Sequence, residues 1–381
     1  MPSGTQAFDW AVPDEWTIRH AYIADRSGRR VVDFRKHNLH VVGYSELVDH
    51  WMSLGELDRY LHSLPEQPEA IPYVTSYYQR RWGFCVAHAQ RQALKPGRYR
   101  AVIDSDLKPG VLNYGELILP GSSDHEVLLS TNICHPSMAN NELSEPVVTA
   151  ALAQWLTGLE DRRYSYRIIF IPETIGSIVY LSRHLEHLKT HVVAGFNITF
   201  VGDERGYSYL PSRAGNTLAD HAALHVLAHM APGFTRCSFL DRGSDERQYC
   251  APGVDLPIAT IMRSKYGEYP EYHTSLDDLS FISPEGLEGA FRGLQRCLQA
   301  FEANYRYRAT VPCEPQLGKR KLYPTLSTGK SGKQVRAMLD LLAYADGEAT
   351  LLEIAETIDR DIMECAEIAE SLENYGLLER V

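Results

Sequence analysis

Hydrophobic residues along the middle of the chain alternate between strand-length runs and helical spacings. An apolar run at 126–133 precedes a helical pattern at 146–156, with apolar residues at 147, 148, 151, 152, 155 and 156. The order then repeats to about residue 307, with strands predicted at 166–171, 192–201 and 258–262 and helices at 176–188, 218–229 and 284–305. This rhythm predicts an α/β unit, a mostly parallel sheet with helices on both faces.

The residues before this unit have a different pattern. From 1 to about 95, short β-branched and aromatic runs are separated by turn residues, which predicts a β-rich subdomain. It closes with a short helix at 53–63, a proline-rich segment and an aromatic run at 73–84. The aromatic run forms either a packed cover or a binding wall, and packing is the commoner use because aromatics bury large areas. Strands at 98–105 and 114–119 then lead into the α/β unit, placed at 96–310.

The last part of the chain has the order of a winged-helix module. A linker rich in proline and glycine at 311–332 precedes amphipathic helices at 334–344, 351–358 and 362–375. From 334 to 381, three basic residues stand against twelve acidic ones, a net charge of −9. Four glutamates on the third helix would repel the phosphates of a DNA groove. We therefore expect residues 333–381 to contact a protein partner or a second copy, and no nucleic acid.

Composition narrows the class of protein further. Of 381 residues, 44% are hydrophobic and 23% charged, as in soluble globular proteins, and the net charge of −11 argues against nonspecific nucleic-acid or membrane binding. No apolar run reaches about 18 residues, and the first residues lack a signal-peptide pattern, so we expect a cytoplasmic protein. The seven cysteines show no Cys-x-x-Cys spacing, which indicates neither a disulfide framework nor a cysteine zinc site.

Candidate chemistry gathers in the loops that follow the predicted strands. Because open α/β sheets bind ligands at the carboxyl ends of their strands, these loops are expected to meet at one edge. Their polar residues are His135, Asn140, Asn141 and Glu142 after one strand, Glu173 after the next, Asp203 to Arg205 after the third, and His273, Asp277 and Asp278 in the last, preceded by Asp245, Glu246 and Arg247.

Two histidines and carboxylates from separate loops are ligands that zinc uses, and a further glutamate suits a base that takes a proton from bound water. Each residue also has a structural interpretation. A histidine is often only hydrogen-bonded, a glutamate before a helix is stabilised by the helix dipole, and Asp203 with Arg205 could be an ion pair. Asp277 and Asp278 could cap the next helix. The meeting of all these loops at one sheet edge favours a site.

These residues resemble the zinc aminopeptidases that include the bacterial leucyl aminopeptidases and, as a relative, glutaminyl cyclase. The similar segments are Cys134-His-Pro-Ser-Met-Ala-Asn-Asn-Glu-Leu-Ser144, Phe170-Ile-Pro-Glu-Thr174, Asp203-Glu-Arg-Gly-Tyr207 and His273-Thr-Ser-Leu-Asp277. The whole chain is similar to bacterial aminopeptidase-like proteins that join this domain to an amino-terminal β-rich domain and a carboxyl-terminal winged helix. The resemblance implies a phosphorylase/hydrolase-like sheet. Such relatives carry an extra helical segment before the β-rich domain, so the chain is expected to start late.

The departures from that family change the expected site. Asn140 stands where the peptidases have a metal-bridging aspartate, and Thr174 where they have a second liganding glutamate. Glu145 replaces a usual glycine. The resemblance therefore implies one zinc ion per chain, not two, held by His135, Asp203 and His273. Asn140 or Glu142 would complete the ligands, and Glu173 would remain as the base.

The leading hypothesis is a zinc-dependent hydrolase of a small amino-acyl or peptide-like amide. Substrate would be recognised through charge-assisted hydrogen bonds from residues near the site, namely Glu142, Asp245, Glu246, Arg247, Arg263 and Tyr272. The alternative is a catalytically inactive scaffold that binds a metal or ligand, suggested by Asn140 and Thr174. A transcription regulator is a third hypothesis, which the acidic module disfavours.

Overall fold

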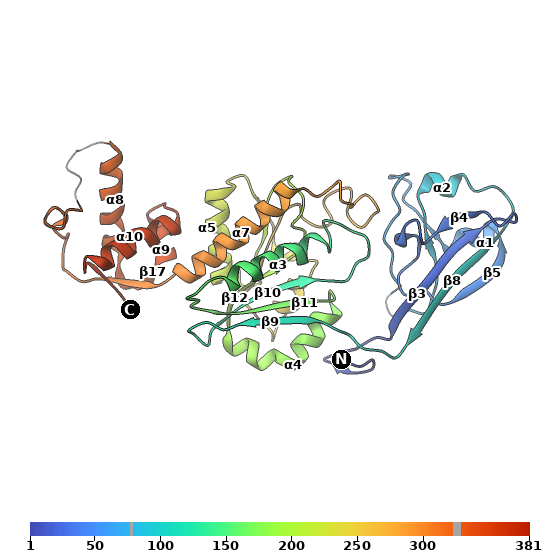
Figure 1. Ribbon diagram of the computed structural model, residues 1–381, viewed down its shortest axis with the longest axis horizontal. Coiled ribbons are helices and arrows are strands. Elements are labelled where there is room, and N and C mark those ends of the chain that lie inside the picture. The colour runs from blue at the N-terminus through green and yellow to red at the C-terminus, as the bar shows by residue number, and fades with distance from the viewer. Residues whose placement is uncertain (77–78, 323–328) are drawn as a thin grey trace.

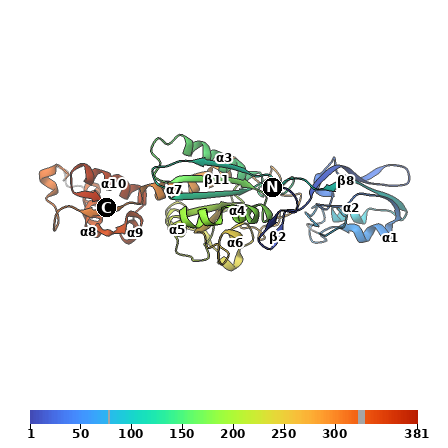
Figure 2. The same ribbon diagram turned by 90° about the horizontal axis from the view of Figure 1, so that it is seen from below.

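The computed structural model describes residues 1–76, 79–322 and 329–381. An amino-terminal β-rich unit, a central α/β unit and a carboxyl-terminal helical module follow one another along its length (Figure 1). The view turned by 90° shows the same elongated order (Figure 2). Tyr77 and Tyr78 of the aromatic run and residues 323–328 of the expected linker lie outside the described residues. Within the described ranges, no helix combines the length and the apolar character needed to cross a bilayer.

The central unit is built on a seven-stranded sheet in the order β14-β13-β15-β12-β10-β11-β9. Its strands are β9 (Gly115–Leu119), β10 (Glu126–Asn132), β11 (Ser165–Ile171), β12 (Val192–Ile198), β13 (Ser208–Leu210), β14 (Thr235–Arg236) and β15 (Ile258–Met262). The α/β class is confirmed, and β10 pairs in parallel with β11 and β12. The sheet is nevertheless mixed, because β9 runs antiparallel to β11 and β13 runs antiparallel to β15.

Helices cover both faces of this sheet, as the alternation of side chains along a strand requires. They are α3 (Ser144–Thr157), α4 (Ile175–His191), α5 (Leu218–Met230), α6 (Glu246–Tyr249) and α7 (Pro284–Ala303). Val127 and Leu129 of β10 share one core with residues of α3, α5 and α7, whereas Leu128 shares another with residues of α4 and α6. All seven residues of β10 are buried, which explains its continuous apolar run.

The amino-terminal unit contains a four-stranded antiparallel sheet in the order β4-β3-β8-β5. Its elements are β3 (Glu15–Ala24), β4 (Arg30–Asp33), β5 (Val48–Ser53), α1 (Leu54–Leu57), β6 (Leu61–His62), β7 (Phe84–Cys85), α2 (His88–Gln92) and β8 (Arg98–Lys108). The preceding strands β1 (Gln6–Ala7) and β2 (Trp10–Ala11) pair with each other and lie against α4 of the central unit (Figure 2). The expected boundary at 95 falls before β8, which pairs with β3 and β5 and therefore belongs to this unit. The helix expected at 53–63 is only α1 followed by a 3₁₀ turn.

The carboxyl-terminal module has the winged-helix order. Its elements are β16 (Arg306–Ala309), α8 (Gly329–Tyr344), β17 (Asp346–Thr350), α9 (Leu351–Thr357), α10 (Ile362–Asn374) and β18 (Leu378–Arg380). β16 is the central strand of the module's sheet, so the module begins before the expected linker. The backbone N–H of Ile362 donates to Nε2 of His225 on α5 at 2.9 Å, and Asp361 forms an ion pair with Arg296 on α7. The first turn of α10 is therefore packed against the α/β unit.

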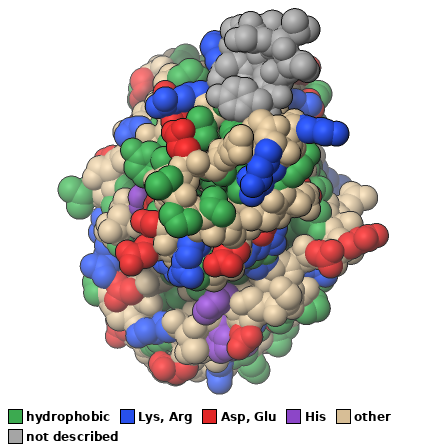
Figure 3. Space-filling model, turned by 90° about the vertical axis from the view of Figure 1, so that its left-hand side faces the viewer, with side chains coloured by type: hydrophobic (Ala, Val, Ile, Leu, Met, Phe, Trp, Pro, Cys, Tyr) green, Lys and Arg blue, Asp and Glu red, His purple; other side chains and the backbone are tan. Residues whose placement is uncertain are grey.

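Figure 3 shows the molecule from this end, where acidic, basic and hydrophobic side chains are mixed over the surface. Arg360 pairs with Glu364 and Arg380 with Glu373, so basic residues of the module are engaged with glutamates of α10.

Candidate active site

The site lies where the loops after β10, β11 and β12 meet the loop between β15 and α7. Its central residue is His135, which is buried in the loop after β10. Glu142 returns to it from the end of the same loop, with Oε1 2.5 Å from Nδ1 of His135 and Oε2 accepting from the N–H of Cys134 at 2.5 Å. Burial alone would lower the pKa of His135, but hydrogen bonds with Cys134 and Glu142 raise it well above its usual value. Glu142, one of the residues expected to bind substrate, is in direct contact with His135.

Glu173 follows β11 and lies on the other side of His135. Its Oε2 is 3.8 Å from Nε2 of His135, so the two expected site residues are brought together. Burial raises the pKa of Glu173, the nearby Glu142 raises it further, and His135 and Arg247 oppose the shift. A carboxyl group with a raised pKa is suited to proton transfer near neutral pH.

Thr174, the residue after Glu173, has an unusual backbone with φ of +65°, which is strained for a β-branched residue. Two contacts hold it there: its N–H donates to Oδ1 of Asp245 at 2.7 Å, and its hydroxyl accepts from Nη2 of Arg247 at 2.6 Å. Burial and the charge of Glu173 raise the pKa of Asp245 to about 8. Asp245 therefore holds the start of α4 in position. Arg247 places a positive charge beside Thr174, the residue that stands where the similar peptidases have a second liganding glutamate.

Asp203 and Asn140 are engaged with each other and with the backbone. Asp203 accepts from Nδ2 of Asn140, from the N–H of Arg205, and from both the N–H and the hydroxyl of Ser264, at 2.8–3.2 Å. Oδ1 of Asn140 accepts from the N–H groups of Gly202 and Asp203. Both side chains are buried and use their oxygens within the protein.

Other expected site residues also support the loops. Oε1 of Glu246 accepts from Gly243 N–H, Ser244 N–H and Tyr266 hydroxyl, and its Oε2 accepts from Asn197. Nε of Arg263 donates to the carbonyl of Asp203 at 2.7 Å, and its guanidinium lies over the ring of Tyr207. Glu145, in the place of a usual glycine, accepts from Thr199 and Phe200. Asp277 accepts from three backbone N–H groups at 139–141, rather than capping the next helix.

His273 lies close to His135, with the two ring centres 5.1 Å apart. Tyr272 stacks on it at 3.9 Å, which gives this expected substrate-binding residue a packing role. Burial and the neighbouring His135 lower the pKa of His273 to about 3, so it stays uncharged at neutral pH. Tyr73 packs edge-on against both histidine rings, at 4.9 and 5.2 Å.

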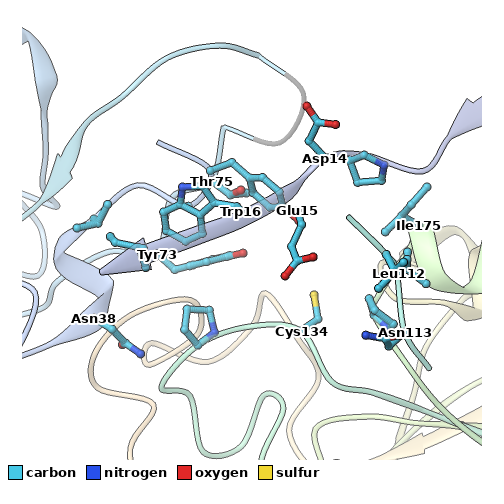
Figure 4. Close-up of a pocket in the computed structure, with 18 of the residues that line it drawn as sticks. Asp14, Glu15, Trp16, Asn38, Tyr73, Thr75, Leu112, Asn113, Cys134 and Ile175 are labelled. Carbon is cyan, nitrogen blue, oxygen red and sulfur yellow. The ribbon is translucent and has the colours of Figure 1, made fainter. Parts of the chain in front are cut away.

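The amino-terminal unit completes the site, which the sequence did not reveal. The N–H of Tyr73 donates to the carbonyl of His273 at 2.8 Å, and Pro72 forms an isolated bridge with Thr274. Between the units lie two adjoining cavities of about 490 and 500 Å³ that share lining residues such as Tyr73 and Cys134. Tyr73 of the aromatic run thus lines both cavities. Figure 4 shows Glu15, Tyr73 and Cys134 around one of these cavities.

His135 and His273 offer imidazole nitrogens, which are donor atoms that zinc commonly binds in proteins. Zinc bound to one nitrogen of each imidazole at about 2.0–2.1 Å would place the ring centres roughly 5 Å apart, as they are for His135 and His273. The contact of Glu142 with Nδ1 of His135 is the kind that orients metal-binding histidines. The spacing of the two rings thus leaves room for one zinc ion between them. Among the described residues, the group of ligand atoms found within 4.8 Å of one another is Cys134, His135 and Glu142, and neither Asp203 nor His273 belongs to it.

The fold is shared with solved structures of aminopeptidases. The structure is similar to a zinc aminopeptidase from Bacillus subtilis, with a TM-score of 0.55 and 13% identity over 77% of this chain and 83% of the other. It is also similar to an M28 peptidase precursor from Shewanella amazonensis, with a TM-score of 0.54 and 11% identity over 79% and 84%. At these identities the likeness shows the fold alone, which is that of the aminopeptidases.

Closer relatives share the whole arrangement of units. The chain belongs to the family described as Domain of unknown function (DUF4910), whose model matches residues 1–304, and a winged helix-turn-helix model matches 305–380. A Clostridium acetobutylicum protein, provisionally named for polysaccharide biosynthesis with an aminopeptidase-like domain, is 39% identical over all of this chain and 88% of its own length. A crystal structure of a provisionally named peptidase from C. acetobutylicum has a TM-score of 0.93 and 38% identity, over 100% and 87%.

Proposed function

We propose that the protein is a zinc-dependent, aminopeptidase-like hydrolase of a small amino-acyl or peptide-like amide, with Glu173 as the general base. The observation that carries this proposal is the position of the Glu173 carboxylate, at the wall of a cavity of about 500 Å³ and 3.8 Å from Nε2 of His135. The raised pKa of Glu173 supports the same role, because a base works best when its pKa lies near the working pH.

His135 and His273 would hold one zinc ion, with Glu142 fixing the orientation of His135. A bound zinc ion lowers the pKa of water to about 7 and polarises a carbonyl. Arg247 lines the same cavity as Glu173, and it would bind a carboxylate or carbonyl oxygen of the substrate. Tyr73 closes the site beside both histidines and would exclude water from it.

A second candidate function is a scaffold that binds a ligand without turnover. The observation that favours it is the engagement of Asn140 and Asp203 with protein donors, which leaves the histidine pair without a third protein ligand of the expected kind. Arg247 beside Thr174 supports it too, since a fixed guanidinium supplies positive charge that a second metal ion would otherwise bring.

Metal content separates these functions. We expect about one zinc per chain in protein purified without added metal, lost in both His135→Ala and His273→Ala. Glu173→Gln should keep the zinc and lose turnover on an amino-acyl amide panel by about 10²–10⁴-fold, whereas Glu186→Gln, an exposed residue of α4, should keep both. An active Glu173→Gln variant would remove the base role. If the purified protein contains no zinc, binds none when zinc is added and shows no turnover, the ligand-binding scaffold is the function that remains.

A further inference from the structure

The cavity beside the site has a wall from each unit. On the side of the α/β unit, Cys134, Pro172 and Ile175 line it; on the amino-terminal side, the wall includes Glu15, Trp16 and Tyr73. Glu15 points into the cavity toward Cys134 (Figure 4). Asp14, Asn38, Thr75 and Asn113 also line this cavity, so Glu15 is one of two carboxylates on a partly polar wall. Carboxylates in such a place favour a cation and disfavour an anion.

Glu15 has no positive partner in the described part of the chain. Its cross-strand neighbour is Lys108, but Nζ of Lys108 pairs with Asp106 at 3.0 Å. Asp14, the residue before it, pairs with Arg80 at 3.5 Å. No hydrogen bond or ion pair among the described residues reaches the carboxylate of Glu15, which therefore keeps its capacity for a ligand.

Neighbouring residues determine the orientation of the Glu15 side chain. A Cβ atom added to Gly110 would come within 2.2 Å of Oε2 of Glu15, so the side chain lies closely against a glycine that leaves it room. Trp16 is held by its Nε1–H, which donates to the carbonyl of Ser45 at 2.9 Å, and it stacks on Tyr44 at 5.9 Å. The aromatic wall around the carboxylate is therefore preformed.

We infer that Glu15 and this aromatic wall recognise the free α-amino group and apolar side chain of the substrate. An ammonium group would bind the carboxylate with Trp16 and Tyr73 rings beside it, a combination that selects cations. Tyr73 also contacts His135 and His273, so a ligand along this wall reaches the catalytic residues. The inference rests on the proposed function, because the cavity lined by Glu15 adjoins the cavity lined by Glu173, and it adds a specificity residue from the amino-terminal unit.

Calorimetric titration of the full chain in a Glu173→Gln background tests this without turnover. The probes are L-phenylalaninamide, which carries the amine, and its two neutral analogues, N-acetyl-L-phenylalaninamide and 3-phenylpropanamide. We expect L-phenylalaninamide to bind about tenfold more tightly than either analogue, the size of one charge-assisted contact. Glu15→Gln should reduce this preference to about twofold or less, and Asp14→Asn, the matched control, should retain it.

A second variant keeps the Glu15 carboxylate but displaces it from its position. Gly110→Ala should push the Glu15 side chain aside and also reduce the preference for the amine. Equal binding of the three probes, a preference that survives Glu15→Gln, or no binding of L-phenylalaninamide would each overturn the inference. These outcomes leave the zinc content and the effect of Glu173→Gln on turnover to decide the proposed function separately.

Discussion

Asn140 and Asp203 are bonded to each other twice: Nδ2 of Asn140 donates to Oδ2 of Asp203 at 3.2 Å, and Oδ1 of Asn140 accepts from the Asp203 N–H at 3.2 Å. Because the amide is neutral, it donates to a buried carboxylate without bringing a second negative charge. The pair ties the loop after β10 to the turn after β12. The residue that distinguishes this chain from the two-metal peptidases is therefore also a structural link.

Replacing the Asn140 amide by a carboxylate should place two negative charges close together in the buried site. We expect Asn140→Asp to destabilise the metal-free protein by about 2–4 kcal/mol, because two carboxylates would then face each other in a buried site. Zinc should restore much of the loss by binding between them. Thermal unfolding with and without zinc measures both effects, and the exposed Asn216→Asp should show neither. A variant as stable as the parent without zinc would contradict this account.

Glu142 should act through His135. We expect Glu142→Gln to reduce zinc affinity about 10–100-fold, because it removes the carboxylate that orients the imidazole. It should also lower stability by about 1–3 kcal/mol, since the amide cannot accept from both the N–H of Cys134 and His135 with one oxygen. Competition with a chelator and chemical denaturation give these two quantities. Unchanged zinc affinity would show that His135 does not need this partner.

The contact between the module and α5 should be sensitive to pH. Burial and the neighbouring His229 lower the pKa of His225 to about 4, from an ordinary 6.5, while Asp361 opposes the shift and Arg296 adds to it. Neutral His225 accepts from the N–H of Ile362. In the unfolded chain His225 takes up a proton below about pH 6.5, whereas in the folded protein it does so only near pH 4. The contribution of neutral His225 to the stability of the folded protein is therefore complete above pH 6.5 and is lost as the pH falls toward 4.

Unfolding temperatures between pH 4.5 and 7.5 measure this effect. Glutamine can accept the same hydrogen bond without titrating, so His225→Gln should flatten the pH dependence in this window. His50→Gln changes an exposed histidine of β5 and should leave the dependence unchanged. Equal slopes for the parent and His225→Gln would show that this contact does not titrate.

Helix α7 approaches the site closely at its first turn. A Cβ atom on Gly286 would lie 2.0 Å from the carbonyl oxygen of Gly202 and 2.7 Å from that of Asp203. Gly286→Ala must therefore shift the helix or the turn, and we expect a loss of about 1–3 kcal/mol together with weaker zinc binding. Gly206→Ala is the control, because nothing lies within 4 Å of its added atom. Denaturation and metal titration of both variants check this.

The parts of the fold that local pattern determines could be predicted. β10 is buried along its whole length and α3 carries a helical apolar spacing, so both were located within a few residues. The order of loops after parallel strands also predicted that His135 and Glu173 would meet. β8 could not be assigned in this way, because an apolar strand has the same pattern whichever sheet it joins, and its pairing with β3 is a long-range choice.

The finer features of the site depend on contacts that the sequence pattern does not carry. Asp203 accepts a hydrogen bond from Ser264, which lies 61 residues further along the chain. The position of Tyr73 depends on the bridge between Pro72 and Thr274. Arg247 was expected near the site, but its hydrogen bond with Thr174 was not foreseen. Glu15 gave no signal, since a single acidic residue at the start of a strand is common on protein surfaces.

Helix α7 is a rigid connection between the terminal module and the turn that carries Asp203. Its 20 residues form a rod of about 30 Å. One end touches the turn that carries Asp203, and the other continues into β16, the central strand of the terminal module. One rigid helix therefore joins the terminal module to the turn that carries Asp203, so the position of the module and the position of that turn are linked.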